Sequence, residues 1–338
     1  MSLRSRVFAL VAVVVLVASG ATVYVLVSRQ ELAEAVAGAP PVPVVSDPTT
    51  VTGGPRIVFR STAIGNQYGL VAQVPLADPG GPRLFTTASC ERVYATGTAA
   101  VCLSANRGLV TTYTAEVLGP DWRSRQSLPL SGVPSRARLS RDAGMVATTT
   151  FVAGHDYSRP GTFSTQTLVT AVGTRRTVDI EEFALIVDGS RVTAADRNLW
   201  GVTFRDNDRF YATAASGGRT WLVEGSVSAR RLVALREDAE CPSLSPDGTR
   251  VAVKTRGGLP PGRWRIAVYD LARRTTTMLA ELRSVDDQIE WLDDSRVVYG
   301  LPQAGTGPTT SDVWEVPADG TGAPRLLIRD AWSPAVIR

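Results

Sequence analysis

Hydrophobic positions follow two different patterns along the chain. Residues 7–27 form an uncharged, mostly apolar run with no polar face, whereas beyond residue 55 short apolar stretches alternate with polar ones. A helix of about 20 apolar residues is long enough to cross the hydrocarbon core of a bilayer. The pattern therefore predicts one transmembrane helix followed by a separate folded domain.

The flanks of the apolar run indicate its orientation. Arg4 and Arg6 precede it, and Arg29 follows it before the acidic residues Glu31 and Glu34. The positive-inside rule then favours a short cytoplasmic tail over residues 1–6 and an extracytoplasmic remainder. An uncleaved signal-anchor is the favoured interpretation, which makes the protein a single-pass protein of the cell membrane. The alternative is a cleaved signal peptide with its cleavage site at the small residues 35–37, and this would make the protein secreted.

Residues 28–54 read as a linker. They begin with a short stretch rich in Ala and Glu, which is followed by Pro40, Pro41, Pro43 and Pro48. Prolines favour an extended, polyproline-like backbone and make a linker semi-rigid. We expect this linker to hold the folded domain away from the membrane surface and to carry no chemistry.

The folded domain consists of repeats. Short runs rich in Val, Thr, Leu, Ile and Tyr are separated by Gly, Pro, Asp and Asn, as is typical of all-β structure. In the clearest unit, a strand leads through an Asp-Gly turn at Asp247-Gly248 into three further strands. A period of about 40–50 residues with four strands per unit is typical of a β-propeller blade. Such units are found at residues 90–130, 135–182, 197–236, 240–283 and 287–330.

The two ends of the domain complement one another. Residues 55–61 start it like the second strand of a unit, without a first strand before them, and residues 331–338 resemble a first strand. We expect the C-terminal strand to complete the first blade and close the ring, because closure leaves neither end blade with an unpaired edge. The prediction is an all-β propeller of about six blades over residues 55–338, preceded by one transmembrane helix.

One repeat carries a resemblance to a known family. Ser245-Pro246-Asp247-Gly248 resembles the motif of TolB-type, WD40-like propeller repeats, and residues 332–334 are similar to a truncated copy of it. The resemblance implies a propeller fold and is nearly silent on function. TolB is a periplasmic protein of an envelope complex and has an α/β domain before its propeller. This chain has a membrane helix and a linker in that place, so TolB's partners cannot be carried over.

The chain has three cysteines. Cys90 and Cys102 flank a turn near Thr96 and are expected to lie about opposite each other on paired strands. A disulfide between them is the favoured interpretation outside the cytoplasm, and a pair of buried thiols is the alternative. Cys241 has no obvious partner, and we expect it to be a buried inner-strand thiol.

Charge narrows the class of partner. The 338-residue chain has a net charge of +4, and Lys254 is its only lysine. Its arginines are scattered rather than gathered in one run, which argues against nucleic acid. The expected partners are the membrane, through the N-terminal helix, and an envelope protein or ligand that the sequence does not identify.

Candidate catalytic residues are few. His155 is the only histidine, so a multi-histidine metal site is excluded and a Ser/His/Asp triad would depend on this residue. It falls in an apparent loop insertion, where a surface role is the simpler interpretation. The glycine-rich segment 257–262 lacks the Lys-Ser/Thr of a phosphate-binding loop and reads as a strand connection.

Acidic groups are the remaining candidates. Asp286, Asp287 and Glu290 could act as paired carboxylates or bind a cation, whereas residues 293–294 and 206–208 fall where a sister unit has its Asp-Gly turn. A turn explains these last two groups more simply, and the segment 206–208 lacks the glycine and distal glutamate of a calcium loop. We therefore predict no catalytic, cofactor-binding or metal-binding residues.

These observations favour a non-enzymatic role. The expected function is a membrane-anchored interaction or ligand-binding scaffold in the cell envelope. The alternative is a propeller enzyme, a hydrolase or lyase, with its site in the central channel, because propellers host both kinds of function. An accessory subunit of a membrane or secreted enzyme would have the same sequence features. Converging carboxylates in the channel would favour an enzyme, and a mixed polar surface would favour a binding face.

Overall fold

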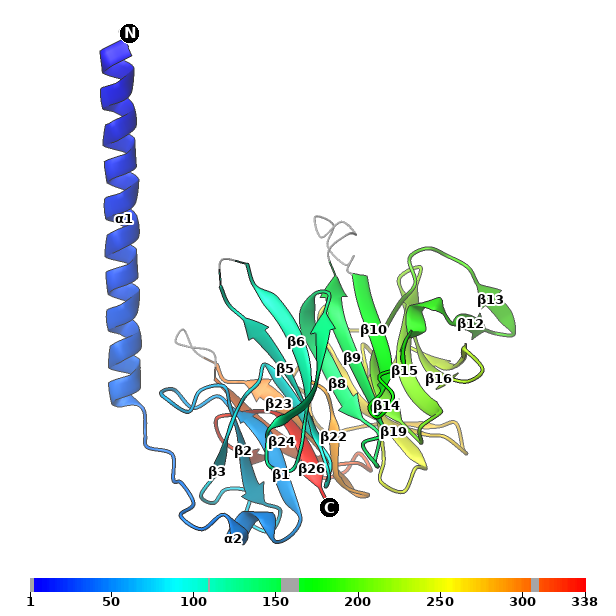
Figure 1. Ribbon diagram of the computed structural model, residues 1–338. Coiled ribbons are helices and arrows are strands. Elements are labelled where there is room, and N and C mark those ends of the chain that lie inside the picture. Colours follow the sequence, from blue (N-terminus) through cyan, green and yellow to red (C-terminus); the bar gives the residue numbers. More distant parts are fainter. Residues whose placement is uncertain (1–2, 109, 153–163, 305–309) are drawn as a thin grey trace.

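The computed structural model describes residues 3–108, 110–152, 164–304 and 310–338. Within these residues six sheets are arranged radially around a central axis, and a long N-terminal helix extends beyond them (Figure 1). The domain is a six-bladed β-propeller, which confirms the predicted fold class and blade number.

In blades 2 to 6 the four main strands follow one another outward from the central axis in chain order, whereas blade 1 has the last strand of the chain innermost. Blade 1 is β26 (Ala331–Ile337), β1 (Arg56–Ser61), β2 (Leu70–Pro75) and β3 (Leu84–Ser89), and blade 2 is β4 (Arg92–Ala95), β5 (Ala100–Asn106), β6 (Thr112–Leu118) and β7 (Ser124–Leu130). Blade 3 is β8 (Val133–Leu139), β9 (Met145–Val152), β10 (Ser164–Ala171) and β11 (Thr177–Asp179), and blade 4 is built on β14 (Asn198–Phe204), β15 (Arg209–Ser216), β16 (Arg219–Ser226) and β17 (Arg231–Glu237). Blade 5 is β18 (Glu240–Leu244), β19 (Arg250–Thr255), β20 (Arg265–Asp270) and β21 (Thr276–Met278), and blade 6 is β22 (Glu290–Asp293), β23 (Arg296–Pro302), β24 (Ser311–Pro317) and β25 (Arg325–Ile328).

The hydrophobic core is divided among the joints between neighbouring blades. Successive side chains of a strand point to opposite faces of its sheet, so a blade can bury apolar residues on both sides. In β19, Val251 and Val253 pack against blade 4, whereas Ala252 between them packs against blade 6. The described residues form one apolar cluster at each of the six joints, so each blade is stabilised by both of its neighbours.

The C-terminal strand closes the ring. β26 pairs antiparallel with β1, and the pairs include Arg56 with Ile337 and Ile57 with Val336. The blade formed in this way packs on blade 6 through a cluster that includes Phe59 and Val298. The first blade is therefore composed of segments from both ends of the domain.

Blade 4 has an additional hairpin that the repeat pattern did not predict. β12 (Ala184–Val187) and β13 (Ser190–Val192) lie between the predicted units, and β12 runs parallel to the outer strand β17. A hairpin added at the outer edge pairs backbone groups that would otherwise face solvent. It follows no four-strand period, and repeat counting therefore misses it.

The N-terminal helix α1 (Leu3–Gly38) is longer than the predicted span. Its apolar residues are exposed, which is consistent with a membrane anchor or a signal sequence. Residues 28–38 were expected to belong to a linker but continue the helix, because their Ala, Glu, Gln and Leu are good helix formers and the first proline comes only at Pro40.

The second half of the predicted linker is bound to the propeller. Val44 forms a bridge with Arg83, whose backbone N–H donates to the carbonyl of Pro43 at 2.8 Å. The short helix α2 (Thr49–Thr52) then buries Val51 against the domain. Pro43 takes part through its carbonyl group, which a proline retains, so its presence does not prevent this docking.

Candidate functional site

The two faces of the propeller are built differently. We call the turn face the side where the inner strands end and turn into the second strands, at residues 96–99, 140–144, 205–208, 245–249 and 294–295. The loop face is the opposite side, where second and third strands are joined and where blades are connected, at residues 62–69, 107–108, 110–111, 217–218, 256–264 and 279–289. The carboxyl terminus and α2 lie at the turn face (Figure 1).

The repeat motif forms one of the turns on the turn face. Asp247 accepts hydrogen bonds from the Ser245 hydroxyl at 2.5 Å and from the backbone N–H and hydroxyl of Thr249 at 3.0 and 2.8 Å. Gly248 has a φ of +72°, which a residue with a side chain adopts only with strain. The Asp247 N–H donates to Asp294 of blade 6 at 3.0 Å, so this motif also links neighbouring blades.

In the other acidic turns the carboxylates likewise accept hydrogen bonds from the turn or from a neighbouring blade. Asp142 accepts from the Ser140 hydroxyl at 2.7 Å and from the side chain of Asn207 at 2.6 Å. Asp206 accepts from two backbone N–H groups of its own turn, and Asp293 accepts from Ser295. Within the described part of the chain, no group of three or more His, Cys, Asp or Glu side chains could hold a metal ion.

A cavity of about 480 Å³ opens at the centre of the turn face. Its wall combines the aromatic ring of Tyr94 and the side chains of Leu139 and Ile337 with polar groups on the turns. The charged residues that line it are Arg138, Arg141, Asp142, Glu290 and Arg338. A cavity of this size with mixed lining is typical of a site that holds a small ligand or part of a partner protein.

An ion pair across the channel forms the floor of this cavity. Arg138 of blade 3 donates to Glu290 of blade 6 and, at 3.3 Å, to the hydroxyl of Ser243 in blade 5. Its guanidinium also lies 4.5 Å from the centre of the Tyr94 ring of blade 2. Burial alone would lower the pKa of Arg138, but Glu290 and Tyr94 raise it, so this residue stays a cation that ties four blades together.

A second layer of charges lies closer to the loop face. Arg92 donates to Asp287, which also accepts from the backbone N–H of Gly300 at 2.9 Å. Asp286 accepts from Lys254 at 2.6 Å and lies 3.6 Å from Arg136. Burial would raise the pKa of Asp286, but the two neighbouring cations lower it below its usual value.

The structure therefore brings together the acidic residues that the sequence offered as paired carboxylates, but as halves of ion pairs. Asp286 contacts the buried Lys254 and Glu290 the buried Arg138, whereas Asp287 contacts Arg92, which is partly buried. Sequence reasoning missed the cations. The alternation Arg136-Ala137-Arg138 on a predicted inner strand was the available signal, because residues two apart on a strand point to the same side.

Cys241 lies in the wall of the same channel. It is buried on β18, and its backbone N–H donates to the hydroxyl of Thr213 at 2.8 Å. Gly201 of the neighbouring inner strand approaches it so closely that a Cβ there would come within 2.9 Å of the Cys241 Cα. Burial would lower the pKa of Arg136, but the neighbouring Cys241 and the Asp286 carboxylate raise it above its usual value.

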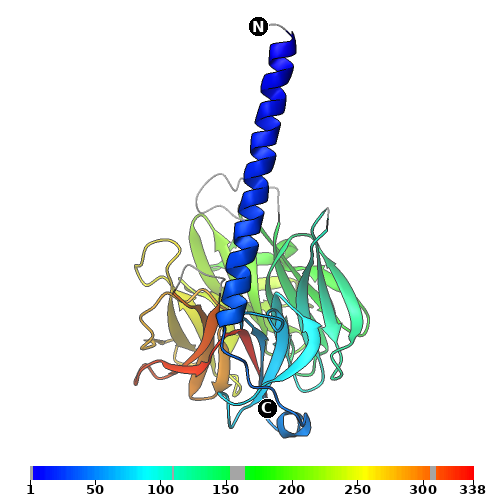
Figure 2. The same ribbon diagram turned by 90° about the vertical axis from the view of Figure 1, so that its left-hand side faces the viewer.

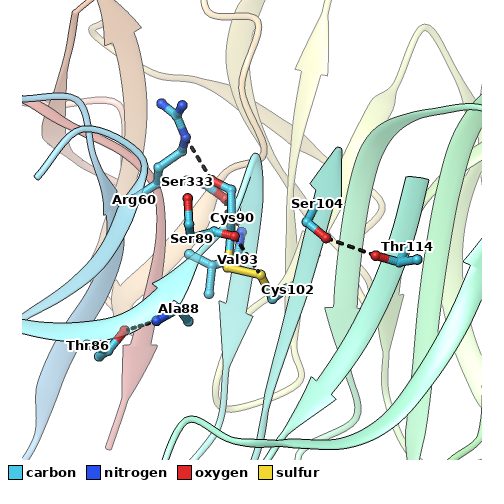
Figure 3. Close-up of a disulfide and its surroundings, with 10 residues drawn as sticks. All are labelled: Arg60, Thr86, Ala88, Ser89, Cys90, Val93, Cys102, Ser104, Thr114 and Ser333. Carbon is cyan, nitrogen blue, oxygen red and sulfur yellow. Dashed lines mark hydrogen bonds between the residues drawn. A yellow bond between two sulfur atoms is a disulfide. The ribbon is translucent and has the colours of Figure 1, made fainter. Parts of the chain in front are cut away.

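Cys90 and Cys102 are joined by a disulfide in the structure, with their Cα atoms 5.3 Å apart (Figure 3). Cys102 is on β5, whereas Cys90 lies just before β4 rather than on the paired strand. Both are buried between blades 1 and 2, and Arg60 donates to the Cys90 carbonyl at 2.8 Å. The bond joins the connection between these blades to the second strand of blade 2.

Loss of the disulfide is expected to lower the free energy of unfolding by about 3 kcal/mol, because the bond restricts the unfolded chain over a short loop. Urea unfolding of the oxidised protein, of the protein with reductant, and of a Cys90→Ser/Cys102→Ser variant would measure this. The last two should agree with each other. Alkylation of both thiols without reductant, detected by mass spectrometry, would contradict the bond.

A buried carboxyl group lies outside the channel. Glu181 belongs to the 3-10 helix η1 (Ile180–Glu182) and accepts from the backbone N–H of Leu199 at 2.9 Å and from the hydroxyl of Thr165 at 3.1 Å. Its other oxygen is buried without a hydrogen-bond partner. Burial raises the pKa of Glu181 from 4.5 to about 8, so the group is mostly protonated at neutral pH.

Glu181 should make the propeller less stable as the pH rises. The folded state holds the proton more tightly than the unfolded state, so the free energy of unfolding should fall between pH 4.5 and about 8, by roughly 1.4 kcal/mol per pH unit. The variant Glu181→Gln should remove this dependence and be more stable than the parent at pH 8. Urea titrations at several pH values would test this, with exposed Glu182→Gln as the control. Parallel pH profiles of the parent and Glu181→Gln would contradict it.

Two further candidates from the sequence do not contribute to the cavity or the channel described above. Residues 257–262 lie in the loop that joins β19 to β20 on the loop face. His155 lies outside the described residues.

The propeller is similar to several solved structures. It superposes on TolB from Acinetobacter baumannii with a TM-score of 0.55 and 16% identity, covering 84% of this chain and 67% of that one. A chain of the nidogen/laminin complex gives 0.52 and 9%, covering 84% and 98%. A Mycobacterium tuberculosis puromycin-hydrolyzing peptidase gives 0.50 and 18%, covering 81% of this chain but only 43% of the peptidase. No protein-family model matches the chain, and no curated protein matches it in sequence.

These likenesses establish the fold and no more. Identities of 9–18% are too low to carry a function from one propeller to another, because this fold hosts many activities. The predicted resemblance to TolB-like propellers is confirmed at the level of the fold.

Proposed function

We propose that this chain is a membrane-anchored, extracytoplasmic propeller that binds a protein or other envelope ligand at its turn face. The N-terminal helix is the anchor, and residues 43–52 attach it to blade 1. The cavity at the centre of the turn face is the binding site. The same arrangement would serve an accessory subunit of an envelope enzyme, whose ligand is then that enzyme.

The observation that carries the proposal is the contrast between the mouth of the channel and its interior. The interior is occupied by complementary ion pairs, among them Arg138 with Glu290 and Arg92 with Asp287. A carboxylate held in a buried ion pair is a poor general acid or base, because its oxygens are already occupied by the partner cation. The mouth, by contrast, presents Arg141 and the turn residues to solvent.

Two of the similar structures are consistent with a binding role. TolB-like propellers support a protein-interaction scaffold in general, and the nidogen/laminin structure is a complex of two proteins. Neither gives the identity of a partner for this chain.

The alternative function, a propeller enzyme acting in the central channel, is supported by the likeness to the puromycin-hydrolyzing peptidase. The match spans less than half of that peptidase, so the likeness is confined to part of an enzyme. A hydrolase acting in the channel would require the ion pairs of its interior to open.

Reversing the charge of Arg141 at the mouth of the channel should abolish binding of the partner. Arg141 is exposed, lines the cavity and donates to the carbonyl of Pro246 at 2.7 Å. We expect crosslinking and affinity capture from native membranes to recover a stoichiometric partner with the parent protein and to lose most of it with Arg141→Glu. The control is Arg191→Glu, which makes the same charge change on β13, away from the cavity.

Equal recovery with Arg141→Glu and Arg191→Glu would show that the turn face is not the binding site. Recovery of no partner, together with turnover by the purified protein in a substrate screen, would favour the enzyme instead. The intact mass of the protein in the membrane fraction separates the two anchoring alternatives, because a cleaved signal peptide would remove residues up to 37 or close to it.

A further inference from the structure

Exposed apolar side chains are distributed unequally over the two faces. The loop face presents Val110 at 77% exposure, Leu282 at 75% and Leu259 at 38%. On the side of the turn face, Val44 beside Arg83 is 54% exposed, whereas the described turns between inner and second strands present no large apolar side chain exposed to this degree. Single apolar residues on a surface are ordinary, but several on the loops of one face indicate a contact surface.

The course of the N-terminal segment places the loop face toward the membrane. α1 runs alongside the propeller and extends past the loop face in both views (Figures 1 and 2). Its attachment at Val44 lies on the opposite side, near the connection between β2 and β3. The chain therefore runs from its attachment on the turn-face side toward the loop face, in the direction of the segment predicted to span the bilayer.

The lengths agree with this placement. The helical residues 28–38 rise about 16 Å, and residues 39–43 add at most about 17 Å when extended. Strands of six to eight residues, such as those of blade 3 and blade 4, are about 20–27 Å long. The bilayer surface therefore comes within about 10 Å of the loop face when α1 is inserted.

Arginines accompany the apolar tips. Arg107 is three residues before Val110, Arg263 follows Leu259 in the same loop, and Arg283 is next to Leu282. All three are exposed, although Arg107 and Arg283 also form ion pairs within the propeller. Guanidinium groups bind phosphate oxygens, and apolar tips beside them can enter the boundary between headgroups and acyl chains.

We propose that the loop face rests on the outer surface of the bilayer, with Val110, Leu259 and Leu282 inserted at the headgroup boundary. The partner is the phospholipid surface, and the inference rests on the proposed anchoring by α1. The turn face then points away from the membrane, which leaves its cavity open to the extracytoplasmic space.

Spin-label accessibility in the full-length protein tests this. Single variants Leu282→Cys and Val110→Cys are labelled after reconstitution, one copy per disc, into nanodiscs of phosphatidylglycerol and phosphatidylcholine. Ala229→Cys, in an exposed turn of blade 4 on the side of the turn face, is the matched control. Val17→Cys reports on the anchor. The unsubstituted protein measures background labelling, which should be small because Cys241 is buried.

We expect the labels at positions 282 and 110 to collide several-fold less often with a water-soluble nickel chelate than the label at 229. The label at 17 should be accessible to oxygen and shielded from nickel. Equal nickel access at 282, 110 and 229 with a shielded position 17 would overturn the inference and leave the anchor in place. Nickel access at position 17 would overturn both this inference and the proposed anchoring by α1. Shielding at 282 that appears only with two copies per disc would indicate a contact between copies and overturn the lipid assignment.

Discussion

Deletion of residues 331–338 should abolish cooperative folding of the propeller. The deletion removes β26, which provides the innermost strand of blade 1 and the partner of β1. It also removes buried apolar side chains, among them Ala331, Ala335 and Val336, from the joints on both sides of that blade. A domain is stable by only about 5–15 kcal/mol in total, so opening the ring and exposing two joints should exceed that margin.

Circular dichroism and urea unfolding would measure the effect. The truncated protein should show no cooperative transition, whereas removal of Arg338 alone should shift the midpoint only slightly, because this residue contributes one hydrogen bond to the carbonyl of Trp291. A synthetic peptide of residues 331–338 should restore part of the transition, since strand addition supplies the missing backbone hydrogen bonds. An unchanged midpoint in the truncated protein would show that β26 does not close the ring.

Removal of the cation in the channel floor should have the second largest effect. The side chains of Arg138 and Glu290 are only 3% and 6% exposed, so the pair is almost completely withdrawn from water. The variant Arg138→Met keeps much of the side-chain volume but leaves the Glu290 carboxylate buried and unpaired. Breaking a buried ion pair in this way costs about 3–5 kcal/mol.

The double variant Arg138→Met/Glu290→Met separates the loss of the ion pair from the cost of leaving the Glu290 carboxylate buried and unpaired. Replacing both charges by apolar groups is often neutral or stabilising, so the double variant should regain most of the lost stability. Urea unfolding of the four proteins in the double-mutant cycle gives the coupling energy directly. A loss below about 1 kcal/mol in the single variant would contradict a buried pair, because that is the range of exposed ones.

The blades could be predicted from the sequence because each repeats a local pattern. Two-residue alternation defines the strands, and the Asp-Gly turn at Asp247-Gly248 marks where the first strand of a unit ends. The hairpin β12–β13 could not be found in this way, because it occurs once and pairs in parallel with β17. Residues 28–38 differ from the predicted linker because the prolines begin only at Pro40, and the good helix formers before them continue α1.

The site was harder to predict than the fold. Asp286, Asp287 and Glu290 stand close together in the sequence and are easily noticed as a group. Their partners Arg92 and Arg138 come from other blades, 195 and 152 residues away in the chain. No local pattern records which inner strands face each other across a channel, so the sequence showed the acids and not the bases that pair with them.

The pairing of β26 with β1 also has a consequence for biogenesis. β1 emerges from the ribosome before the other blades, and β26 follows all of them. Chains grow by about 5–20 residues per second, so one edge of β1 stays unpaired for roughly 10 s or longer while the rest of the domain is made. An unpaired strand edge is a template for aggregation. Folding of this protein should therefore depend on a chaperone that covers the nascent edge until β26 is synthesised.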